Sequence, residues 1–104
     1  MIEVTEKMKE KIFTIADYYE EKQLDQTVEE CSELIQAIMK FKKKRNEGTI
    51  HNIAEEIADV WIMLQQLIYL NNEVGRTVEG IVEEKLDRQL KRIEKEIEER
   101  YENS

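Results

Sequence analysis

Two segments of the chain hold acidic residues at helical spacing and no Lys or Arg. Glu30 and Glu33 are three positions apart in the stretch VEECSELIQAIM, and Glu56 and Asp59 are three apart in HNIAEEIADVWIML. Residues at this spacing project from the same side of a helix, one turn apart. Ligand sets made only of oxygen select hard cations such as Mg²⁺, with Mn²⁺ as an alternative, over Zn²⁺. Both segments are therefore candidate halves of a metal site.

If the two segments pack as antiparallel helices, four carboxylates would face one another. Without a counter-charge they would have to take up protons or bind cations. Ligands on rigid helices, with waters completing the shell, fit Mg²⁺ better than Ca²⁺. The alternative is an ordinary solvated acidic face, as in EKEIEER near the C-terminus, where Glu alternates with Lys95 and Arg100. The absence of basic neighbours and the place of Glu56 within an apolar arc favour the metal site.

The elements that must position these carboxylates are helices, because apolar residues recur along the chain at helical spacing. The pattern predicts four of them, at roughly 5–21, 25–46, 50–73 and 77–101. Gly48 and Gly75 are predicted to end helices, and Thr49 and Thr77 to begin them as N-caps. The length of 104 residues suits one domain, 1–104. We expect an all-α, four-helix bundle-like protomer.

The third helix is apolar almost all round from Ile57 to Leu70. Such a helix must be covered on several sides, and three short partner helices would hardly do so. A second copy of the chain would, which predicts a homo-oligomer, either a homodimer or a homotetramer. Trp61 lies in this segment and is expected in the core or the interface.

Composition excludes several partners. With 24 acidic and 16 basic residues the net charge is -8, which disfavours binding to a nucleic-acid polymer. The longest nearly apolar stretch, VWIMLQQLIYL, is too short to span a membrane. The N-terminal residues have no apolar run of signal-peptide length. The single cysteine, Cys31, cannot form an intramolecular disulfide, so we predict a soluble protein of the cytoplasm.

EECSE followed by EEIAD resembles the E-E-x-x-E … E-x-x-D signature of the MazG-like all-α nucleoside triphosphate pyrophosphohydrolases. That group includes dimeric dUTPases, dCTP pyrophosphatases and phosphoribosyl-ATP pyrophosphohydrolases. The resemblance runs from about Gln26 to Arg92. It implies a MazG-type protomer, and dimers or tetramers with sites near subunit contacts.

The resemblance also implies roles for single residues. By position, the Mg²⁺ ligands would be Glu30, Glu33, Glu56 and Asp59. Glu29 matches the first Glu of the signature, and would lie beside the ligands and help to orient the attacking water.

Phosphate and substrate contacts are expected mainly from the last helix. The family has a Lys, an Asn and an Arg-Tyr pair there, and KLDRQLKRI supplies Lys85 and Arg92. Gln89 stands at the family's Asn and Ile93 at its Tyr, which leaves the finer contacts open. Arg88 would add positive charge, although all three basic residues also suit a plain charged helix. One turn before Glu56, Asn52 is a further candidate for touching substrate.

The implied function is Mg²⁺-dependent hydrolysis of an NTP or dNTP between the α and β phosphates, giving a monophosphate and pyrophosphate. Such an activity would clean or control the nucleotide pool. The alternative is a non-enzymatic helical interaction module whose acidic patches dock a basic partner. A di-iron carboxylate bundle is a weaker reading, because such sites use E-x-x-H and the only His, His51, has no Glu at that spacing.

Overall fold

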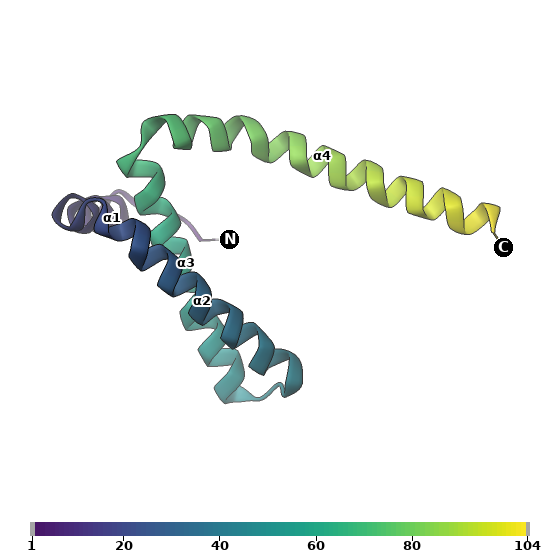
Figure 1. Cartoon of the computed structure of the whole chain (residues 1–104), viewed down its shortest axis with the longest axis horizontal. Helices are drawn as coiled ribbons and strands as arrows, with labels where there is room; N and C mark the ends of the chain where they lie inside the picture. Colours follow the sequence, from purple (N-terminus) through teal and green to yellow (C-terminus); the bar gives the residue numbers. More distant parts are fainter. Residues whose placement is uncertain (1, 104) are drawn as a thin grey trace. The chain divides into compact units, whose positions relative to one another are not determined.

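The structure is a computed structural model that describes residues 2–103 (Figure 1). These residues form four helices and no strand, which confirms the predicted all-α class. The helices are α1 (Glu6–Tyr19), α2 (Lys22–Lys43), α3 (Glu47–Leu70) and α4 (Asn72–Glu102). The chain divides into two compact units, Met1–Asn72 and Glu73–Ser104, and each is described by itself. The single domain and the bundle arrangement therefore stay predictions. In the described part of the chain, no helix is long and apolar enough to cross a membrane.

The first unit is built around a hairpin of α2 and α3, which lie side by side and run in opposite directions (Figure 1). The two helices are joined by residues 44–46 alone. A reciprocal capping box begins α3: Asn46 Oδ1 accepts from the Thr49 backbone N–H at 2.9 Å, and Thr49 Oγ1 accepts from the Asn46 N–H at 3.0 Å. The short, capped connection fixes one end of the hairpin.

The predicted start of α3 was wrong by one turn. Gly48 does not end a helix but is the second residue of α3, and Thr49 is the third residue rather than the N-cap. The N-cap is Asn46, whose side-chain oxygen would lie 3.2 Å from a Cβ added at Gly48. Glycine at that position leaves room for the cap.

The predicted break at Gly75 and Thr77 was also wrong, since both residues lie inside α4. The Thr77 hydroxyl donates to the Glu73 carbonyl at 2.7 Å, so it serves its own helix instead of capping a new one. The break falls earlier, at Asn71, whose extended backbone (φ -137°, ψ 98°) ends α3.

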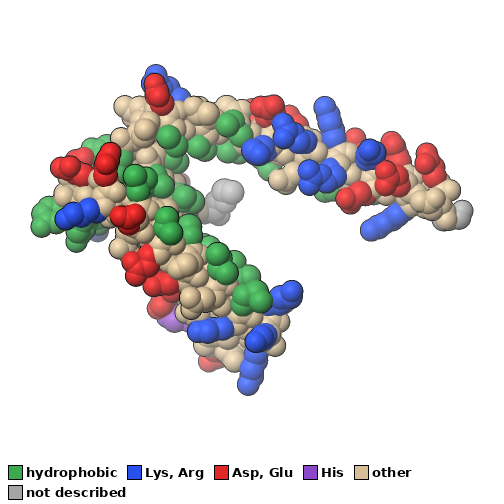
Figure 2. Space-filling view, in the orientation of Figure 1, with side chains coloured by type: hydrophobic (Ala, Val, Ile, Leu, Met, Phe, Trp, Pro, Cys, Tyr) green, Lys and Arg blue, Asp and Glu red, His purple; other side chains and the backbone are tan. Residues whose placement is uncertain are grey.

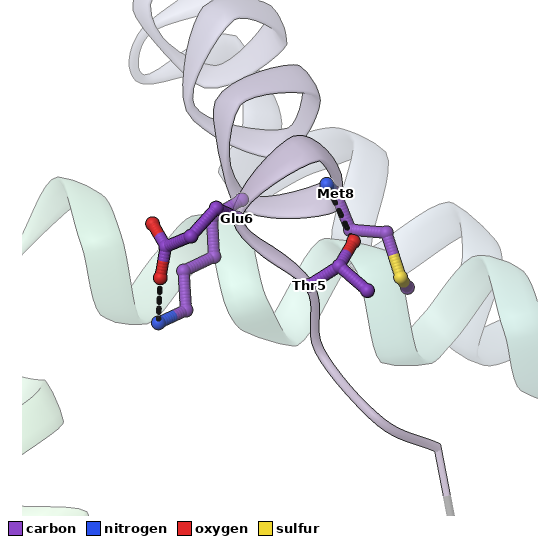
Figure 3. Close-up of polar contacts among 4 residues, drawn as sticks. Thr5, Glu6 and Met8 are labelled. Carbon is purple, nitrogen blue, oxygen red and sulfur yellow. Dashed lines mark hydrogen bonds and ion pairs between the residues drawn. The ribbon is translucent and has the colours of Figure 1, made fainter.

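The start of α1 is capped by Thr5, whose Oγ1 accepts from the Met8 N–H at 3.2 Å (Figure 3). Beside it, Lys9 Nζ lies 3.3 Å from Glu6 Oε1, one turn away on the exposed face. The cap satisfies a backbone group that the first turn would otherwise leave open to solvent.

α1 packs on α3 through an aromatic pair and two buried apolar side chains. The rings of Phe13 and Tyr69 stack with centroids 4.0 Å apart, and the Tyr69 hydroxyl donates to Asp17 Oδ2 at 3.1 Å. Ile12 and Ala16 are buried. α1 therefore supplies apolar packing outside the contact between α2 and α3.

The contact between α2 and α3 follows a seven-residue repeat typical of paired helices. On α2, Gln23 and Ala37 are buried and Glu30, midway between them, is half-buried. The same spacing on α3 separates Glu56 from Met63. We call this contact the hairpin seam; its residues are Gln23, Thr27, Glu30, Leu34, Ala37 and Phe41 on α2, and Asn52, Glu56, Asp59, Met63 and Gln66 on α3. The seam is unusual because seven of these eleven positions are polar or acidic.

Apolar side chains lie instead on the outside of the hairpin. We call this set the outer stripe; it comprises Leu24, Val28, Ile35 and Ile38 on α2, and Ile50, Ile57 and Leu64 on α3. They are between 44% and 70% exposed. In Figure 2, hydrophobic side chains gather on one side of the hairpin, acidic ones on another, and basic ones at the end near the connection. The first unit thus exposes the residues that a helical pair usually buries.

Replacing Asn46 by Ala removes the side-chain acceptor of the capping box. We expect this to lower the free energy of unfolding by about 1 kcal/mol, measured by chemical denaturation followed by circular dichroism. Lys44→Ala, in the same connection, is the control and should change stability by less than about 0.5 kcal/mol. Equal effects of the two substitutions would show that the cap does not stabilise α3.

Candidate functional site

Three of the predicted metal ligands come together midway along the hairpin. One carboxylate oxygen from each of Glu30, Glu33 and Glu56 lies within 4.8 Å of the others. Glu30 and Glu33 project from α2 one turn apart, and Glu56 faces them from α3. Carboxylate oxygens this close repel one another unless a proton or a cation lies between them.

The fourth predicted ligand, Asp59, lies beside Glu30 but outside this group of three. It follows Glu56 by one turn on α3, and its carboxyl is close enough to Glu30 for the charge of Glu30 to raise its pKa. Its side chain is exposed, as is that of Glu33, whereas Glu30 and Glu56 are half-buried. The cluster therefore has an inner part at Glu30 and Glu56 and an open edge at Glu33 and Asp59.

Two oxygens of the cluster are buried without a partner among the described residues: Glu30 Oε2 and Glu56 Oε2. The other oxygen of Glu30 accepts from Gln26 Nε2 at 2.9 Å. Burying a carboxylate oxygen with no hydrogen bond is costly. A divalent cation would satisfy both oxygens, and an all-oxygen donor set on rigid helices fits Mg²⁺.

Repulsion within the cluster changes its acid–base behaviour. The negative charge of Glu30 is the main cause that raises the pKa of Glu33, with smaller effects of desolvation and of Glu56. For Asp59, desolvation of the carboxyl raises the pKa most, followed by the charge of Glu30. Both groups thus hold protons more tightly in the folded chain than they would in water.

Among the described residues of the first unit, no Lys or Arg forms an ion pair with these four carboxylates. The nearest cationic candidate in sequence is His51, whose Nε2 lies 2.8 Å from Glu55 Oε1 on the exposed side of α3. Within that unit, the negative charge of the cluster is therefore balanced by no described basic side chain.

Two further candidates lie next to the cluster. Glu29 is exposed on α2, and its charge contributes to the raised pKa of Glu33. Asn52 is half-buried on α3, one turn before Glu56. Their contacts with water or substrate stay predictions.

The phosphate- and substrate-binding candidates predicted on the last helix lie on α4, in the second unit. Lys85, Arg88, Gln89 and Arg92 are all exposed there. Arg88 lies 3.6 Å from Glu84 on the same helix. Their place relative to the carboxylates stays a prediction.

Trp61 does not lie in the seam. It is half-buried and lines an apolar cavity of about 390 Å³ between α1 and α3, together with Ile12 and Ile62. The one charged residue of its lining is Lys11.

Two glutamine contacts near the cluster were missed in the sequence. Gln26 precedes Glu30 by four residues, a spacing that allows a side-chain hydrogen bond on a helix. Gln23 and Gln66 form a buried pair at the open end of the hairpin. Gln23 lies seven residues before Glu30, and Gln66 lies seven residues after Asp59. This seven-residue repeat is the sequence signal that would have identified the pair.

In comparisons with protein-family models, curated proteins and solved structures, nothing matched this chain.

The raised pKa values of Glu33 and Asp59 predict how stability depends on pH. A carboxyl with a higher pKa in the folded state binds protons more tightly there, so its contribution to stability is present at low pH. It is lost as the pH rises from the ordinary value, 4.5 for Glu and 3.8 for Asp, through the raised pKa. We expect the melting temperature in EDTA to rise as the pH is lowered from 7 through this range.

The double variant Glu33→Gln/Asp59→Asn should reduce this dependence, while Glu94→Gln on α4 should leave it unchanged. Melting curves followed by circular dichroism test this expectation. A pH dependence that is as steep in the double variant as in the natural chain would contradict it.

Proposed function

We propose that this chain is a Mg²⁺-dependent nucleoside triphosphate pyrophosphohydrolase. It would cleave an NTP or dNTP between the α and β phosphates, releasing a monophosphate and pyrophosphate. The observation that supports this most strongly is the pair of buried, unpartnered oxygens of Glu30 and Glu56 beside Glu33. The same residues, with Asp59, are the acidic positions of the E-E-x-x-E … E-x-x-D resemblance.

In this proposal the hairpin seam holds the ligands before the cation arrives. Glu30, Glu33 and Glu56 converge from two rigid helices, and Asp59 completes the set from the open edge. Because nearby carboxylates repel one another, the site favours a divalent cation over none. When bound, Mg²⁺ supplies the positive charge that polarises an attacking water and neutralises phosphate oxygens.

The remaining candidate residues would orient the attacking water or bind the substrate. Glu29, exposed beside the ligands, would accept a proton or hydrogen bond from the attacking water. Lys85, Arg88 and Arg92 would pair with the phosphates, as cations on a solvated helix are able to do. Asn52 and Gln89 would contact the substrate.

We further propose that two or more copies associate through the outer stripe. On α2 and on α3 the stripe is rotated from the seam in the same sense, so in an antiparallel pair both halves fall on one face of the hairpin. Val28 and Ile35 are 70% and 62% exposed there. An apolar face of this kind is a liability in a monomer, and a second copy would bury it.

The catalytic proposal is tested by assaying pyrophosphate release from a panel of NTPs and dNTPs. We expect hydrolysis of at least one nucleotide with Mg²⁺ and none in EDTA. Glu33→Gln and Asp59→Asn should each lower the rate roughly 100-fold or more, because even partners outside the ligand set typically cost 10–100-fold. Glu55→Gln, at the exposed residue that pairs with His51, is the matched control and should retain activity.

No hydrolysis across the full panel with Mg²⁺ or Mn²⁺ would refute the catalytic proposal. Calorimetric titration with Mg²⁺ then separates the remaining readings. If the chain binds Mg²⁺ and Glu33→Gln abolishes this binding, the protein has the cation site but is not a hydrolase. If the chain does not bind Mg²⁺, the remaining hypothesis is the helical module that docks a basic partner.

The association proposal is tested with Val28→Glu/Ile35→Glu, which places charges in the centre of the outer stripe. We expect sedimentation velocity to show oligomers for the natural chain and monomers for this variant, because burying unpaired charges is costly. Lys40→Glu, on the polar side of α2, is the control and should remain oligomeric. A natural chain that is monomeric at tens of micromolar would refute the proposal.

A further inference from the structure

A buried amide pair joins α2 to α3 at the open end of the hairpin. Gln23 Nε2 donates to Gln66 Oε1 at 2.5 Å. The two side chains are 5% and 1% exposed, and Gln66 is the largest fully buried side chain among the described residues. A glutamine is an unusual choice for such a position, since buried amides must find a partner or lose free energy.

We propose that the pair of Gln23 and Gln66 positions the carboxylates of the candidate cation site. It would fix α2 against α3 in the one register that brings the acidic residues of the two helices together. The inference rests on the proposed function for its ligand, Mg²⁺, but its physical basis is a contact within the hairpin.

The register follows from the numbering. Glu30 lies seven residues after Gln23, and Asp59 lies seven residues before Gln66. Seven residues are close to two turns, so in an antiparallel pair a step of seven along each helix leads from one contact to the next, and Glu30 lies beside Asp59. Glu33 and Glu56, each three residues further from the amides, also lie close together. One hydrogen bond and both carboxylate contacts therefore belong to a single register.

The carboxylates lie between two fixed ends of the hairpin. At one end the short connection and the capping box of Asn46 and Thr49 hold the helices together. At the other end stands the amide pair. Between them, repulsion among Glu30, Glu33 and Glu56 pushes the helices apart.

Apolar contacts alone would resist this repulsion without fixing the register, since they are not directional. A hydrogen bond between buried amides is directional, so a slide or rotation of either helix breaks it and leaves two unsatisfied groups. Thr27, in the next layer, donates its hydroxyl to the Gln23 carbonyl within α2 at 2.6 Å. It therefore does not provide a second link to α3. A buried polar pair is a known determinant of register in paired helices.

The test replaces both amides by the near-isosteric Met, in Gln23→Met/Gln66→Met. Because both partners are removed together, no buried polar group is orphaned, and the metal-free melting temperature should be equal to or above that of the natural chain. The dissociation constant for Mg²⁺, measured by calorimetry, should nevertheless rise about 10- to 100-fold, as for other supports of metal ligands. If the pair only stabilised the fold, the melting temperature and the affinity for Mg²⁺ would change together.

Two controls bracket this result. Gln66→Met alone leaves the Gln23 amide unpartnered, and should lower both the melting temperature and the affinity for Mg²⁺. Ile12→Val, in the packing of α1, should lower the melting temperature and leave the affinity unchanged. The proposal is overturned if the double Met variant binds Mg²⁺ as tightly as the natural chain.

A metal-free measurement separates this inference from the proposed function. If the natural chain binds no Mg²⁺, the proposed function fails. Hydrogen exchange in EDTA then tests whether the amide pair positions the carboxylates. Faster exchange of the backbone amides at 30–33 and 56–59 in the double Met variant, without a lower melting temperature, supports the positioning role. Unchanged exchange overturns it.

Discussion

Repulsion among carboxylates inside a helix–helix contact is the constraint on which the first unit depends. Glu30 and Glu56 occupy seam positions that paired helices usually fill with apolar side chains. Each leaves one buried oxygen without a hydrogen bond. The rest of the hairpin compensates: a short capped connection holds one end, and the amides of Gln23 and Gln66 hold the other.

Because the seam is largely polar, apolar packing outside the seam has to stabilise the first unit. The buried apolar side chains of the described chain are few, namely Ile12, Ala16, Ala37 and Met63. Two of these belong to α1, whose contact with α3 is reinforced by the stacking of Phe13 on Tyr69. The outer stripe remains exposed on the hairpin, and its burial by another copy would add the apolar contact that the seam lacks. The acidic seam and the apolar exterior are thus two consequences of one arrangement.

Sequence reasoning reached the helical class, and it placed α2 and α3 within a few residues of their observed ends. It did so because a long apolar repeat is a strong signal. Sequence reasoning failed at the connections. Gly48 and Gly75 are predicted to end helices, yet both lie within helices. A glycine marks a position that tolerates many backbone conformations, and only the neighbouring cap at Asn46 or break at Asn71 decides which one occurs.

The site was predictable to the same degree. Spacing alone identified Glu30, Glu33 and Glu56 as residues of one side of their helices, and the hairpin brings them together. Their unpartnered oxygens, the partner of Glu30 at Gln26, and the buried amide pair depend on side-chain conformations and on the register of two helices. Those quantities arise from packing, which no short motif encodes.

The central claim is that a divalent cation binds in the hairpin seam, and Mn²⁺ titration followed by nuclear magnetic resonance tests it most directly. Paramagnetic Mn²⁺ replaces Mg²⁺ at oxygen sites and broadens the signals of nearby amides. We expect the signals of the amides around Glu30, Glu33, Glu56 and Asp59 to be lost first, at low Mn²⁺, with the acidic surface of α4 unaffected. Broadening that spreads evenly over all acidic surfaces, α4 included, would contradict it.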